Sequence, residues 1–67
     1  MYKIQYKFYT RLSGELIRTD ELSTIVEQNN LSGAKDKFQA IMQEEHKSKN
    51  GFIYQWEITS LQRIIDV

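Results

Sequence analysis

One stretch of this chain has apolar side chains at helical spacing, and it constrains the fold more than any other feature. From Leu31 to Met42 an apolar residue recurs every three or four positions, which places these residues on one helical face. They are Leu31, Ala34, Phe38, Ile41 and Met42. We expect a helix that is capped by Asn29, Asn30 or Ser32 and runs to about Lys47. A single helix can cover one face of a sheet, so we expect strands packed beneath it.

Two other stretches alternate apolar and polar side chains, which is the pattern of a strand with one buried face. Near the N-terminus the apolar positions are Tyr2, Ile4, Tyr6 and Phe8. After the helix they are Phe52, Tyr54, Trp56 and Ile58. We expect both sets to face the helix and to form the core with it.

The segment from Leu16 to Gln28 allows two interpretations. Ser13-Gly14 predicts a hairpin turn, because glycine accepts the positive φ of a tight turn, and a second strand then begins near Glu15. The aspartate of Thr19-Asp20 could instead cap a short helix. We favour a strand with a kink near Thr19-Asp20, since the β-branched run Thr24–Val26 loses less side-chain freedom in a sheet.

The predicted fold class is α+β. It is a ββαβ two-layer sandwich, in which an antiparallel three-stranded sheet of order 2-1-3 carries one helix on one face. The apolar residues after Ile58 change phase, which indicates a β-bulge or a new short element, and we expect a C-terminal strand extension. Because the chain has no proline, repeat or low-complexity run, residues 1–67 are expected to form one small domain.

Composition excludes several classes of function. Nine Lys and Arg balance nine Asp and Glu, so the chain as a whole lacks the basic field of a typical nucleic-acid binder. It has no cysteine for a disulfide or a thiolate metal site, which favours an intracellular setting. The alternation in residues 1–10 differs from a signal peptide, and no stretch is long enough to span a membrane. We therefore expect a soluble, cytoplasmic protein without membrane contact.

Motifs for catalysis, metals or cofactors are missing from the pattern. The only histidine, His46, is expected at the helix end beside Glu44 and Glu45, which do not share one ligand face with it. The glycines at 14, 33 and 51 are isolated and form no phosphate-binding loop. We therefore expect no enzyme activity, no metal and no cofactor.

The sheet face away from the helix is the candidate binding face. Three cations and a tyrosine from the first strand meet residues of the last strand there, and Ile17 could join them. This chemistry suits single-stranded nucleic acid, where bases stack on aromatic rings and cations pair with phosphates. A solvated surface kept soluble by lysine is the favoured interpretation of this face, because Glu57 and the zero net charge both weaken the nucleic-acid interpretation. The candidate residues are Lys3, Lys7, Tyr9, Arg11, Ile53, Gln55 and Glu57.

Protein binding is the function we rank first. A small chain without catalytic motifs acts most simply by covering a partner's surface, as regulators and inhibitors do, and exposed strand edges favour this. The tail residues Leu61, Ile64 and Ile65 would extend beyond one helix and are the candidates for self-association as a homodimer. We predict a small non-enzymatic protein-interaction or regulatory module, whose composition suits a bacterial or phage accessory protein. Binding of single-stranded nucleic acid is the alternative.

Overall fold

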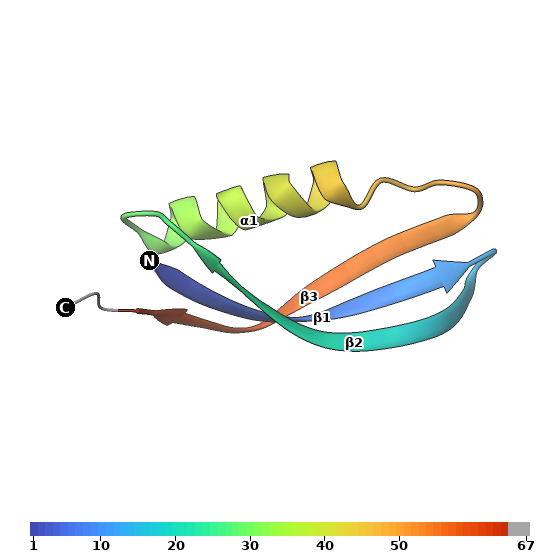
Figure 1. The fold of residues 1–67 in the computed structure, drawn as a ribbon, viewed down its shortest axis with the longest axis horizontal. Helices are drawn as coiled ribbons and strands as arrows, with labels where there is room; N and C mark the ends of the chain where they lie inside the picture. The colour runs from blue at the N-terminus through green and yellow to red at the C-terminus, as the bar shows by residue number, and fades with distance from the viewer. Residues whose placement is uncertain (65–67) are drawn as a thin grey trace.

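A computed structural model describes residues 1–64 as three strands and one helix in the order ββαβ. The strands form one antiparallel sheet of order β2-β1-β3, and the helix lies on one face of it (Figure 1), which confirms the predicted fold class. We call the face under the helix the inner face and the opposite one the outer face. The elements are β1 (Tyr2–Leu12), β2 (Glu15–Val26), α1 (Leu31–Glu45) and β3 (Phe52–Arg63).

Two tight turns close the same end of the molecule. Ser13 and Gly14 have φ angles of 51° and 85°, as in the type I′ turns that join twisted antiparallel strands. Asn50 and Gly51 repeat this conformation before β3, with φ angles of 54° and 82°. The Ser13 amide donates to the Gly51 carbonyl oxygen at 3.1 Å, so the two turns are tied together.

Each edge strand contains one irregularity. In β3, Ile58 pairs with Tyr6 while Ser60 pairs with Gln5, so Thr59 is an extra residue. This bulge explains the change of phase after Ile58, and the predicted strand extension is confirmed as far as Arg63. In β2 the strand prediction is also confirmed, but the irregularity lies at Ile17 rather than near Thr19-Asp20.

The core lies between α1 and the inner face of the sheet. Phe38 is 1% exposed and packs its ring on Tyr6 at a centroid distance of 5.0 Å. Half-buried side chains of β3 close the core on one side, Trp56 among them. The buried residues are Tyr2, Ile4, Phe8, Val26, Ala34, Phe38 and Met42.

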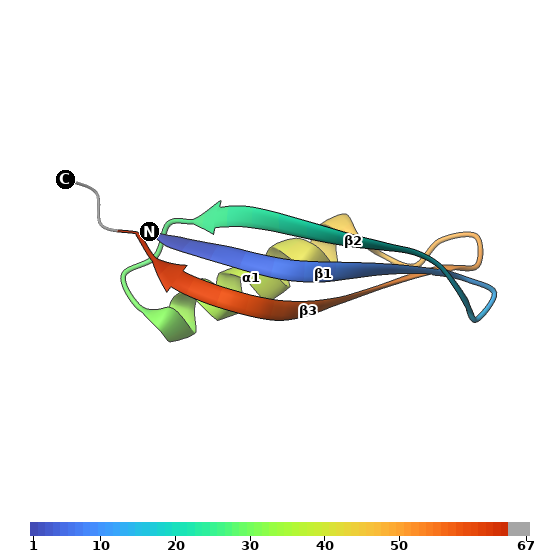
Figure 2. The ribbon, with the colours of Figure 1, turned by 90° about the horizontal axis from the view of Figure 1, so that it is seen from below.

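Two residues of the predicted helix face, Leu31 and Ile41, are exposed rather than buried. The cause is the angle of the helix, because α1 crosses the sheet obliquely from the β3 side to the β2 side (Figure 2). The first turn of α1, which begins at Leu31, therefore lies on the β3 side. Ile41 lies about 200° around the helix from Gln39, which bonds to Trp56 of β3, so Ile41 is on the flank towards β2.

Helix α1 is shorter than the strands it covers. It is capped by Asn30, whose Oδ1 accepts a hydrogen bond from the Gly33 amide at 2.6 Å, and it ends at Glu45 instead of Lys47. His46 follows with the non-helical angles φ −122° and ψ 54°. The fifteen residues of α1 span about 22 Å. The strands have eleven or twelve residues, and a strand of that number of residues spans nearly twice the length of α1. The turn end of the sheet thus projects past the helix (Figure 1).

Candidate functional site

The predicted binding face exists as a set of neighbouring side chains on the outer face. Strand register places the β1 and β3 members opposite one another: Lys7 faces Glu57, Tyr9 faces Gln55 and Arg11 faces Ile53. Lys3 lies on the same face nearer the N-terminus. The structure therefore makes neighbours of six candidates, whereas Lys3 lies opposite Gln62 and Ile25 and apart from them. The six are Lys7, Tyr9, Arg11, Ile53, Gln55 and Glu57.

Polar side chains on this face provide hydrogen-bond acceptors for their neighbours. The Tyr9 hydroxyl donates to Glu57 Oε2 at 3.2 Å, and Arg11 Nε donates to Gln55 Oε1 at 3.0 Å. Lys7 lies between two carboxylates in the register, Glu21 on β2 and Glu57 on β3. These acceptors lower the positive potential that a phosphate would meet.

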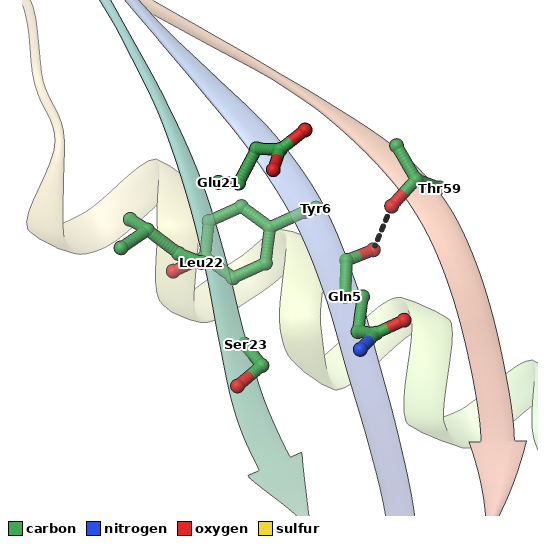
Figure 3. Close-up of a pocket in the computed structure, with 6 residues that line it drawn as sticks. All are labelled: Gln5, Tyr6, Glu21, Leu22, Ser23 and Thr59. Carbon is green, nitrogen blue, oxygen red and sulfur yellow. Dashed lines mark hydrogen bonds between the residues drawn. The ribbon is translucent and has the colours of Figure 1, made fainter.

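A shallow hollow of about 310 Å³ lies along the middle of the sheet. Figure 3 shows its lining, with the Thr59 hydroxyl donating to the Gln5 carbonyl oxygen at 3.2 Å. The other lining residues with polar side chains include Gln5, Glu21 and Ser23. It is open and polar, so it suits water or a polar side chain of a partner better than an enclosed small molecule. The lining residues are Gln5, Tyr6, Glu21, Leu22, Ser23 and Thr59.

Strand β2 carries more exposed apolar side chains than any other described element. It is an edge strand, and of its twelve residues only Val26 is buried. Leu22 lies on the inner face opposite Tyr6, and Ile25 on the outer face opposite Lys3. Among residues 1–64, nine large apolar side chains are exposed, and four of them lie on β2: Leu16, Ile17, Leu22 and Ile25.

The flank of α1 beside β2 extends this apolar surface. Ile41 is exposed there, and Glu45 follows one helical turn later on the same flank. The pKa of Tyr6 is raised above its usual value of 10.0, first by burial and then by the Glu45 carboxylate, which places this carboxylate near the phenol. We call Leu22, Ile25 and Ile41 the β2 edge surface. Sequence analysis missed it, although the predicted order 2-1-3 already places residues 15–26 at an edge.

Two of the three residues predicted for self-association make contacts within their own domain. Leu61 lies opposite Ile4 and packs against the core, so it is not free to cover a partner. Ile64 is half-buried, and its amide donates to the Met1 carbonyl oxygen at 2.9 Å. Ile65 lies outside the described residues.

His46 serves as a packing residue at the end of α1. Its ring lies 4.6 Å from Phe8, 5.8 Å from Tyr54 and 6.4 Å from Trp56, measured between centroids.

No three His, Cys, Asp or Glu side chains within residues 1–64 gather closely enough to hold a metal ion. In the same part of the chain, no helix has the length and apolar character needed to cross a membrane.

The outer face and the β2 edge surface are thus the two candidate sites, and they differ in chemistry. The outer face offers cations beside polar acceptors, with Arg11 bonded to Gln55, whereas the β2 edge surface offers exposed aliphatic side chains beside a free strand edge. Comparison with protein-family models, with curated proteins and with solved structures finds no match for this chain.

Proposed function

We propose that the protein is a small, non-enzymatic protein-interaction module that binds a partner by strand addition at β2. The observation that carries this proposal is the number of exposed apolar side chains on an edge strand. Of the nine large apolar side chains that are exposed among residues 1–64, four lie on β2. As part of the same proposal, the protein acts in the cytoplasm as an accessory or regulatory subunit. The absence of cysteine supports that reducing compartment.

Strand addition suits β2 for two physical reasons. An edge strand has unpaired backbone N–H and C=O groups, and natural proteins usually guard such edges with charged side chains, proline or β-bulges. Residues 22–26 of β2 contain no charged residue, no proline and no bulge. Leu22 and Ile25 point to opposite faces, so an added strand would gain apolar contacts on both sides.

A capture experiment with matched variants tests this function. Tagged protein is incubated with nuclease-treated lysate, retained proteins are identified by mass spectrometry, and their affinities are measured with purified material. Leu22→Lys should abolish retention, because it puts a charge on the edge surface. Leu16→Lys is the control, since Leu16 is exposed on the same strand but lies beyond the bulge at Ile17. Equal retention by the two variants, or a chain that retains no protein and also stays monomeric, would contradict the proposal.

Single-stranded nucleic acid is the second candidate, favoured by one observation. Lys3, Lys7, Tyr9 and Arg11 share the outer face along one strand, as bases and phosphates of a single strand would require. Replacing Lys3 and Lys7 by Glu should then abolish binding in a filter or fluorescence assay. Because only three cations can pair with phosphates, a plot of the logarithm of the binding constant against the logarithm of the salt concentration should have a slope of about −2. No retention of oligonucleotide at low salt would remove this candidate.

A further inference from the structure

We infer that the partner at the β2 edge is a second copy of this chain, paired antiparallel through β2 with Leu22 on the two-fold axis. This inference rests on the function proposed above and names its partner. The pairing would join two sheets into one of six strands, with both helices on the same side. Zero net charge means that two copies do not repel one another at long range.

Symmetry limits the registers that β2 can adopt with itself. Two identical edge strands pair antiparallel about an axis perpendicular to the sheet, which keeps inner faces together. Opposed residues of an antiparallel pair point to the same face, so this axis passes through a residue and not between two. Only residues between the bulge at Ile17 and the strand end at Val26 are available for a continuous ladder.

Charge then separates the remaining registers. An axis through Asp20 or Glu21 would set two like carboxylates opposite each other, which is destabilising. An axis through Ser23 would place the Glu21 carboxylate against Ile25 of the second copy. Each of these alternatives leaves a carboxylate without a suitable neighbour.

The register through Leu22 has no such conflict and pairs the whole of residues 18–26. On the inner face Leu22 meets its own copy, and Asp20 meets Thr24. On the outer face Glu21 meets Ser23, and Thr19 meets Ile25. Arg18 already pairs with Asp20 in its own strand at 2.9 Å, so its charge needs no partner across the axis. Strand β2 is therefore complementary to itself in the register that pairs the largest number of its residues.

The same register buries the apolar groups that the monomer exposes. Leu22 is 44% exposed, and in the dimer it packs against its symmetry mate. Ile41, 38% exposed on the α1 flank towards β2, lies on the same inner side of the sheet as Leu22. Two copies of this flank approach each other across the axis, which extends the core between the helices. A second copy thus supplies backbone partners and apolar cover together.

Cysteine cross-linking tests the register directly, because the chain has no cysteine of its own. Leu22→Cys places the two thiols opposite each other, within the Cα separation of about 4.4–6.8 Å that a disulfide allows. Ile25→Cys is the matched control, since its two copies lie six residues, or about 20 Å, apart along the ladder. Mild oxidation should yield a covalent dimer of Leu22→Cys and not of Ile25→Cys. Equal cross-linking of both, or of neither, would overturn the inference.

Sedimentation equilibrium separates this inference from the broader function. The parent chain should shift from monomer to dimer as its concentration rises, Leu22→Lys should stay monomeric, and Leu16→Lys should dimerise like the parent. Circular dichroism checks that each variant is folded. A parent that is monomeric throughout, yet captures another protein through Leu22, would overturn self-pairing and leave the interaction function standing. A monomer with no partner would overturn both.

Discussion

Strands β1 and β2 are neighbours in the sheet, yet only β1 contributes most of its inner-face side chains to the core. β1 buries Tyr2, Ile4 and Phe8, whereas β2 buries Val26 alone. The difference arises from position, because β1 is the central strand and β2 is an edge. An alternating pattern therefore indicates a strand with two chemically distinct faces, and the neighbours of that strand decide whether the apolar face is covered.

The path of α1 sharpens this difference. The helix crosses the sheet obliquely and reaches the β2 side at its C-terminal end (Figure 2). Leu22 faces the helix side and is still 44% exposed. We infer that β1 supplies stability and β2 supplies recognition, and the following variants test this division.

The largest effect is expected at the centre of the covered region. Phe38→Ala empties an aromatic site that is 1% exposed, and it should lower the free energy of unfolding by about 3–5 kcal/mol. That loss is comparable with the total stability of a domain of this size, so the variant should be largely unfolded. Thermal circular dichroism measures this. A variant that melts like the parent would show that Phe38 is not central to the core.

One substitution made on both strands gives the most direct comparison of β1 with β2. Ile4→Ala, at a site that is 0% exposed, should lower the free energy of unfolding by about 2–5 kcal/mol. Ile25→Ala, at a site that is 59% exposed, should change it by no more than about 0.5 kcal/mol in the monomer. Urea denaturation at low protein concentration measures both. Equal losses would erase the distinction between the two strands.

The start of the helix offers a smaller test of how α1 is held over β1. Asn30→Ala removes the acceptor for the Gly33 amide and should destabilise the protein by about 1 kcal/mol. Asn30→Asp keeps an oxygen at that position and serves as the control. If Asn30→Ala and Asn30→Asp unfold at the same urea concentration as the parent, the cap does not stabilise α1.

The smallest effect concerns Tyr6, which lies between the core and the β2 edge surface. Burial, and then Glu45, raise its pKa above the usual 10.0, so the folded protein holds the phenol proton more tightly than the unfolded chain does. Its contribution to stability is therefore complete below pH 10.0 and is lost as the pH rises through the higher folded value. An ultraviolet titration should show one tyrosine ionising late, and Tyr6→Phe should remove that step. A late step that persists in Tyr6→Phe belongs to another tyrosine.

Much of the fold could be predicted from local pattern, because each element carries its own period. The alternation in residues 2–8 and 52–58 identified two strands, and the changed phase at Leu61 pointed to the bulge at Thr59. The helix angle could not be predicted in this way. Periodicity fixes which residues share a face but not how the helix axis lies on the sheet, so the exposure of Leu31 and Ile41 was missed.

The candidate sites were predicted less completely, for a related reason. The shared outer face of Lys7 and Arg11 follows from alternation alone, but their acceptors depend on strand register. Glu21 and Glu57 flank Lys7 only because β2 and β3 both pair with β1 at that level. The exposure of Leu22 likewise depends on long-range packing and not on its sequence neighbours.

Hydrogen exchange of the two sheet edges, measured at several protein concentrations, tests the proposed role of β2 most directly. Amides of residues 18–26 that point away from β1 should become more protected as the concentration rises, because carbonyl groups of a second β2 strand accept their hydrogen bonds. Amides on the outer edge of β3 should keep the same protection throughout. Protection of β2 that does not change with concentration, or a rise confined to β3, would contradict pairing through the β2 edge.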